Sequence, residues 1–86
     1  MRLTKAEAKW IKDVQAVLDA CPSKRLGFYT IGDAEVVIYD RTKEEKINEL
    51  IDNIHSNKDF CTAVQETKAD IGEGFRFPSC VHSTAG

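Results

Sequence analysis

Long apolar runs are missing from this sequence: the longest uninterrupted one is Val36–Tyr39. A helix that crosses a membrane needs about 20 apolar residues, so we predict no membrane span. The opening segment, Met1–Lys5, leads directly into charged sequence and lacks the apolar stretch of a secretory signal. We therefore expect a cytoplasmic protein with no membrane partner.

Proline and glycine are also scarce, with two and five residues among 86. Together with 42% hydrophobic and 30% charged residues, this scarcity excludes collagen-like, low-complexity and fully disordered chains. A chain of this length has room for one hydrophobic core. We expect one small domain over residues 1–78, followed by a flexible tail over residues 79–86.

Cysteines are few, and their number is odd: Cys21, Cys61 and Cys80. In a cytoplasmic chain, this argues against a disulfide framework. Zinc is the alternative, because His82 adds a fourth ligand of a suitable type, but structural zinc sites usually draw ligand pairs roughly two to four residues apart. Only Cys80 and His82 are that close, so we expect no metal and no cofactor and keep zinc as the minority interpretation.

An excess of positive charge is absent as well, since the net charge is −2 and the pI is about 5.6. Proteins that bind nucleic acid through phosphate contacts usually carry a basic surface, so the charge disfavours that class. The charge is uneven, with eight basic and six acidic residues up to Lys43 but four basic and eight acidic residues after it. An acidic second half would favour a basic partner.

The first helix is predicted by a capping box and an apolar stripe. Thr4 and Glu7 stand three residues apart, as the two reciprocal caps of a helix start require. Apolar residues then recur at helical spacing: Trp10, Ile11, Val14, Val17, Leu18 and Cys21. Pro22 ends the helix. We interpret Trp10 as a core residue at the edge of this stripe.

A β-hairpin is predicted next, from Arg25–Ile31 and Ala34–Tyr39, because both segments are rich in β-branched and aromatic residues. A two-residue turn at Gly32 and Asp33 would pair Ile31 with Ala34. This register places on one face Tyr29, Ile31, Ala34, Val36 and Ile38. It places on the second face Leu26, Phe28, Thr30, Glu35, Val37 and Tyr39.

The second face is unusually apolar for a hairpin that has one side in water. Leu26, Phe28, Val37 and Tyr39 form a patch there, whereas a solvated face normally carries polar residues. Something is therefore expected to cover it: the C-terminal segment of the chain, a second copy, or a partner protein.

Two more helices are expected after the hairpin. A second capping box at Thr42–Glu45 precedes an apolar stripe of Ile47, Leu50, Ile51 and Ile54. His55 follows as a helix-end residue. A short third helix would contain Phe60, Cys61 and Val64, although Cys61–Val64 also fits a strand. After Lys68, the presence of Gly72, Gly74 and Pro78 argues against long regular structure, and only Phe75–Phe77 alternates like a strand.

No residue pattern points to catalysis. Cys80 and His82 are the only close thiol and imidazole, but they fall in the expected tail, where an ordered pocket is missing. Gly72–Gly74 lacks the further glycines of a phosphate loop. Carboxylates fall on solvated helix faces. We expect a protein that is not an enzyme.

The expected fold is α+β: a helix, a two-stranded antiparallel hairpin, a second helix, a short third helix and an irregular C-terminal segment, with the helical stripes on the first hairpin face. The expected function is that of a small non-catalytic protein-binding module, an inhibitor or adaptor, that docks by the second hairpin face or the hairpin edge. The candidate binding residues are Leu26, Phe28, Val37, Tyr39, Phe75 and Phe77.

Two alternatives remain beside this one. The first is a homodimer that joins two hairpins through the same patch. The second is a weak nucleic-acid binder that would use the basic base of the hairpin, namely Lys24, Arg25, Tyr39 and Arg41.

Overall fold

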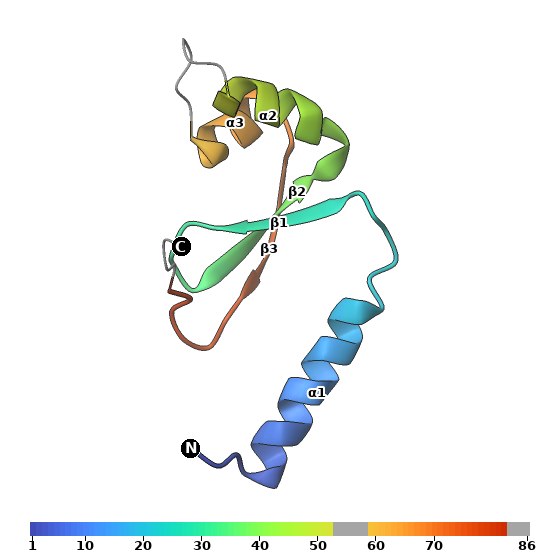
Figure 1. The fold of residues 1–86 in the computed structure, drawn as a ribbon, viewed down its shortest axis with the longest axis vertical. Coiled ribbons are helices and arrows are strands. Elements are labelled where there is room, and N and C mark those ends of the chain that lie inside the picture. The colour runs from blue at the N-terminus through green and yellow to red at the C-terminus, as the bar shows by residue number, and fades with distance from the viewer. Residues whose placement is uncertain (53–58, 83–86) are drawn as a thin grey trace.

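The computed structural model describes residues 1–52 and 59–82, and it confirms the α+β class. Helices and strands follow one another in a simple order along the chain (Figure 1), with these bounds: α1 Lys5–Asp19, β1 Leu26–Thr30, β2 Glu35–Asp40, the 3-10 turn η1 Arg41–Lys43, α2 Glu44–Asp52, α3 Phe60–Glu66 and β3 Asp70–Arg76. Within the described ranges, no helix is both long enough and apolar enough to cross a membrane.

Helix α1 begins at the predicted capping box. The Thr4 hydroxyl accepts a hydrogen bond from the Glu7 amide at 3.1 Å, and the Thr4 amide donates to the Glu7 carboxylate at 2.8 Å. The helix stands away from the sheet and from α2 and α3 (Figure 1), and all of its residues are exposed. The expectation that α1 packs on the hairpin is therefore wrong, and so is the interpretation of Trp10 as a core residue.

The strands form one antiparallel sheet in the order β1-β2-β3. Leu26 pairs with Asp40 and Thr30 pairs with Val36, one residue away from the predicted register. The hairpin turn is therefore longer than the predicted Gly32-Asp33 pair. The Thr30 hydroxyl stabilises it by accepting from the Gly32 amide at 3.2 Å and donating to the Glu35 carbonyl at 3.1 Å.

This shift of one residue exchanges side chains between the two faces, since neighbouring residues of a strand point to opposite sides. Residues paired across the strands share a face, so one face carries Leu26, Phe28, Thr30, Val36 and Ile38. We call it the open face. The opposite face, which we call the core face, carries Gly27, Tyr29, Val37 and Tyr39. The predicted grouping of Val37 and Tyr39 with Leu26 and Phe28 is wrong.

Strand β3 was expected to be irregular because of its glycines. Instead, it pairs with β2 along its length: Val36 lies opposite Phe75, and Ile38 lies opposite Glu73. A bulge follows, since Tyr39 then pairs with Asp70, and Gly72 takes a φ of +73° there. Glycine adopts this left-handed conformation without the steric penalty of a side chain, so Gly72 permits the bulge rather than ending the strand.

The hydrophobic core lies between the core face and the pair α2 and α3. It consists of Tyr39, Ile47, Ala63, Val64 and Ala69, with Tyr29, Leu50, Ile51 and Phe60 packed against it. Tyr29, Tyr39 and Phe60 meet pairwise at ring-centroid distances of 5.2 to 5.9 Å. Such tilted aromatic contacts stabilise a core beyond the area that they bury.

The cap predicted at Thr42 for the second helix is wrong, because Thr42 lies within the 3-10 turn that precedes α2. Asp59 caps α3 by accepting from the Thr62 amide at 2.8 Å, so the predicted third helix is confirmed and the strand alternative is wrong. The carboxylate of Asp40 accepts from the amide and hydroxyl of Thr42 at 2.9 and 2.6 Å and opens the 3-10 turn before α2. Ile54 and His55 lie outside the described residues.

The segment after β3 follows the hairpin turn. The Phe77 amide donates to the Ala34 carbonyl at 2.6 Å, and the Val81 amide donates to the Asp33 carbonyl at 3.1 Å. Between them, the Cys80 thiol donates to the Gly32 carbonyl at 3.3 Å. These bonds place Phe77 beside the end of the open face, and they hold residues 80 and 81, part of the predicted tail, against the turn.

Candidate protein-binding surface

The open face presents two aromatic rings to solvent. Phe28 on β1 and Phe75 on β3 stack across β2 with ring centroids 6.2 Å apart and planes at 21°. Phe28 is 47% exposed and Phe75 is 46% exposed. Their rings lie on a three-stranded sheet, which holds them in place more firmly than a loop would.

Two hollows continue this apolar surface toward α1. One, of about 480 Å³, is bounded by Val17 and Leu18 of α1 and by Leu26, Phe28, Val36, Phe75 and Phe77 on the side of the sheet. The other, of about 470 Å³, lies between Trp10 and Val14 of α1 and the segment Phe75–Pro78. The sheet and α1 are thus the two walls of one groove, which we call the α1 groove.

The helical wall of this groove, with Trp10, Val14, Val17 and Leu18, belongs to an unburied apolar stripe. Trp10, Ile11, Val14, Val17 and Leu18, which we call the α1 stripe, are between 36% and 74% exposed. A helix of 15 residues gains too little from its own hydrogen bonds to be stable alone in water. The α1 stripe therefore needs something to pack against.

The structure brings together four of the six predicted binding residues. Leu26, Phe28, Phe75 and Phe77 all border the α1 groove. Val37 lies on the core face, and Tyr39 is only 5% exposed within the core, so neither belongs to this surface. Both were misplaced because the predicted register was wrong by one residue.

Sequence reasoning missed the helical half of the surface. The amphipathic pattern of α1 was recognised, but amphipathic helices usually cover their own domain, so the stripe was assigned to the core. It also missed Val36, which the observed register moves to the open face beside Phe75. The available signal was the α1 stripe itself, whose apolar residues recur at helical spacing from Trp10 to Leu18.

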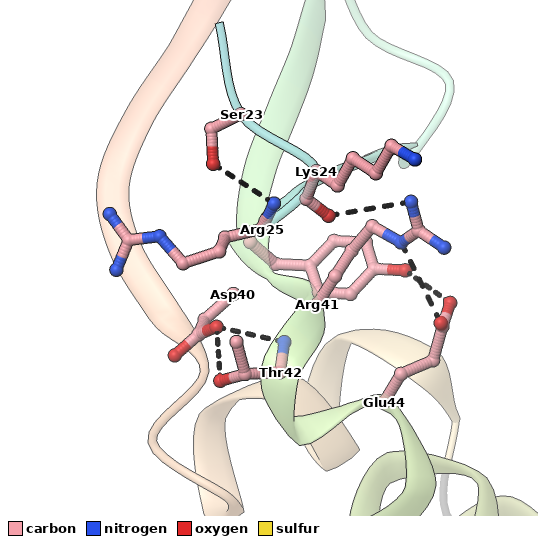
Figure 2. A network of polar contacts seen from close by, with 8 residues as sticks. Ser23, Lys24, Arg25, Asp40, Arg41, Thr42 and Glu44 are labelled. Atoms are coloured by element: carbon pink, nitrogen blue, oxygen red, sulfur yellow. Dashed lines mark hydrogen bonds and ion pairs between the residues drawn. The ribbon is translucent and has the colours of Figure 1, made fainter.

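The basic base of the hairpin contains a network of polar contacts (Figure 2). The Arg41 guanidinium lies 3.6 Å from the Glu44 carboxylate and donates to the Lys24 carbonyl at 3.5 Å. The Tyr39 hydroxyl donates to Glu44 at 3.0 Å. Burial raises the pKa of Tyr39, and the hydrogen bond to Glu44 raises it further. The Tyr39 ring lies in the core and is only 5% exposed.

Backbone contacts in the same region join the start of β1 to the end of β2. The Arg25 amide donates to the Ser23 hydroxyl at 3.0 Å (Figure 2). The Arg41 amide donates to the Arg25 carbonyl at 2.7 Å. The hydrogen bonds from the side chain and the amide of Thr42 lower the pKa of Asp40. The network therefore stabilises the fold at the junction of β1, β2 and α2.

The three cysteines have no disulfide partner. The thiol of Cys21 donates to the Ser23 carbonyl at 3.3 Å, whereas Cys80 bonds to the hairpin turn and Cys61 lies in α3. Burial raises the pKa of the Tyr29 hydroxyl, and Cys61 next to it adds to that shift. Among residues 1–52 and 59–82, no group of three or more His, Cys, Asp and Glu side chains is close enough to hold a metal ion.

Comparisons with known proteins add no relative: no family model matches the chain, and neither the curated proteins nor the solved structures searched include a match.

Proposed function

We propose that this protein is a non-catalytic protein-binding module that binds a polypeptide in the α1 groove. The observation that supports this most strongly is the stacked, half-exposed pair Phe28 and Phe75 on a rigid sheet. Aromatic residues are enriched at the centres of protein interfaces, because they bury a large area and lose little side-chain entropy. A contiguous apolar patch of this kind is expected to be covered in the working protein.

The chemistry around the rings favours a polypeptide over a nucleic acid. The walls of the α1 groove beside Phe28 are aliphatic, from Val17, Leu18, Leu26 and Val36. The nearby Arg76 is paired with Glu35 at 2.9 Å, and the chain carries a net charge of −2. Binding to a phosphate backbone depends on several accessible cations, which this surface does not gather.

The form of the binding follows from which side chains are exposed. A partner that fills the groove would place apolar side chains between α1 and the sheet, as in helix-in-groove recognition. The strand order also makes β1 and β3 the edge strands, so an added strand is a second way to dock. An inhibitor or adaptor, which acts by occupying a site on another protein, would need no chemistry beyond this.

Photo-crosslinking in the cells that make the protein tests this proposal. A benzoyl-bearing phenylalanine analogue replaces Phe28 in one variant and the exposed Lys46 of α2 in the control. We expect protein adducts at position 28 and none of the same mass at position 46. An absence of protein adducts at position 28, or an identical pattern at both positions, would contradict a binding role for the groove.

A further inference from the structure

We infer that the polypeptide covering the α1 stripe is a second copy of this chain, bound by antiparallel packing of α1 on α1 about a two-fold axis at Val14. This inference rests on the proposed function, since it names the partner of the same surface. Three features of α1 and of the open face support it: the symmetry of the stripe, the balance of charge along the helix, and the apolar area available.

The α1 stripe has the same spacing in both directions from its centre. Ile11 and Val17 stand three residues before and after Val14, and Trp10 and Leu18 stand four residues before and after it. In a two-fold antiparallel pair, each copy presents the same patch, so residues equally far from the centre must suit one another. Val14 would meet Val14 of the second copy, Ile11 would meet its Val17, and Trp10 would meet its Leu18.

Charge along α1 permits this pairing. The helix carries three basic residues, Lys5, Lys9 and Lys12, and three acidic ones, Glu7, Asp13 and Asp19, so its net charge is zero. Lys9 and Asp13 already pair within one helix at 2.7 Å. Two such helices approach without net repulsion, unlike helices with a uniformly charged face.

The exposed apolar area is close to what a stable dimer needs. The α1 stripe together with Phe28, Phe75 and Phe77 is between about a third and three quarters exposed. Because a whole aromatic side chain offers about 150–250 Å², the four aromatic residues alone expose on the order of 400 Å² per copy, and the four aliphatic residues of α1 add to this. A standard interface buries about 800 Å² per partner, polar atoms included.

The α1 groove itself has space for the second copy. The hollows of about 470 and 480 Å³ lie between α1 and the open face. Side chains of a second α1, packed against the first, would enter them and reach the rings of Phe28, Phe75 and Phe77. Both walls would then be covered, which explains how α1 holds its helical form at a distance from its own core.

Light scattering of the full chain over a concentration series tests this inference. We expect a mass that rises from 9.6 kDa toward twice that value as concentration increases. Val14→Glu places a carboxylate at the two-fold axis and should keep the chain monomeric. Ala16→Glu adds the same charge two residues further, on the opposite side of the helix, and should leave the dimer intact.

Disulfide trapping tests the predicted contact independently of mass. In a chain whose three cysteines are replaced by serine, Val14→Cys should form a covalent dimer on mild oxidation, and Ala16→Cys should not. A monomer at every concentration, or a dimer that Val14→Glu leaves unchanged, would overturn the inference. If such a monomer still crosslinks to a different protein from position 28, the proposed function survives and only the identity of the partner is wrong.

Discussion

At the scale of single residues, the packing of Tyr39 against Gly27 decides how tightly β1 and β2 meet. The two residues are paired across the strands, and Gly27 is buried. A Cβ atom added at Gly27 would overlap the Tyr39 ring and would lie 2.5 Å from Cγ of Arg41. The absence of a side chain at Gly27 therefore allows the Tyr39 ring to lie over the strand and enter the core.

Gly27→Ala is expected to destabilise the protein by about 1–3 kcal/mol, as other insertions into a packed core do. The added methyl group would push the Tyr39 ring from the core and disturb its hydrogen bond to Glu44. Urea unfolding measures the change. Lys24→Ala, at an exposed position beside the strand, is the control and should alter the free energy of unfolding by less than about 0.5 kcal/mol. Equal stability of the two variants would contradict this account of Gly27.

Two capping carboxylates make stability depend on pH. Hydrogen bonds from Thr42 to Asp40, and from Thr62 to Asp59, lower the pKa of both groups from the ordinary value of 3.8. Each charged cap thus adds stability that is fully present above pH 3.8 and is lost as the pH falls through the lowered pKa of the folded state. Asp40→Ala and Asp59→Ala should be less stable than the wild type at pH 7, with the difference shrinking below pH 3.8. Urea unfolding at several pH values checks this, and a difference that does not depend on pH would refute it.

Substitutions at Phe28 and Ile47 distinguish a residue of the binding surface from a residue of the core. Phe28→Ser should cost roughly 1 kcal/mol or less, because the ring is 47% exposed and stacks on Phe75, which is itself 46% exposed. Ile47→Ala, at a fully buried position, should cost about 2–5 kcal/mol. Thermal unfolding compares the two variants. A loss for Phe28→Ser as large as that for Ile47→Ala would mean that Phe28 belongs to the core rather than to a binding surface.

At the scale of elements, the rest of the chain has a hydrophobic core that does not include α1. The core draws its residues from β2, α2, α3 and the link from α3 to β3, and none of them from α1. The capping box gives α1 a defined start, whereas its stripe faces the α1 groove. Such a helix depends on whatever fills that groove, and it contributes little to the stability of the sheet.

Deletion of residues 1–21 is therefore expected to leave β1, β2, α2, α3 and β3 folded. The tyrosine and amide signals of the core in NMR spectra should keep their positions, because no core residue loses a neighbour. The shortened chain should also remain monomeric at all concentrations. If it were unfolded, α1 would be part of the folding unit and the separation described above would be wrong.

Local signals were sufficient to predict the helices but not the sheet. Capping residues and apolar spacing act within one or two turns, so the start of α1 at Thr4 and the presence of α3 after Asp59 could be predicted from sequence. The sheet register depends on the hairpin turn, where the hydrogen bonds of Thr30 favour a longer loop than the Gly32-Asp33 pair suggests. That single error moved Val37 and Tyr39 to the wrong face.

The third strand and the helical wall of the site could not be predicted, because both depend on distant partners. Gly72 and Gly74 disfavour a strand when considered alone, but β2 supplies the pairing that holds β3, and the bulge at Gly72 uses its positive φ. Likewise, the α1 stripe has the same pattern as a stripe that faces a core, and only the structure shows that the core contains no residue of α1. Phe28 and Phe75 become neighbours only through β2.

At the scale of the whole molecule, the chain consists of a small folded unit and an amphipathic helix that stands away from it (Figure 1). The open face and the α1 stripe are the two large apolar surfaces that the described residues leave exposed, and they face the same groove. One binding event can cover both. In our account, that event is the pairing of two copies through α1, with the aromatic residues of the open face closing the interface.

Trp10 offers the most direct test of this account. It is the single tryptophan of the chain, it lies in the α1 stripe, and it is 56% exposed in one copy. We predict that its fluorescence shifts to shorter wavelength and becomes harder to quench with acrylamide as protein concentration rises, while Val14→Glu keeps the exposed signal throughout. A wild-type signal that stays fully quenchable at every concentration would contradict the pairing of α1 helices.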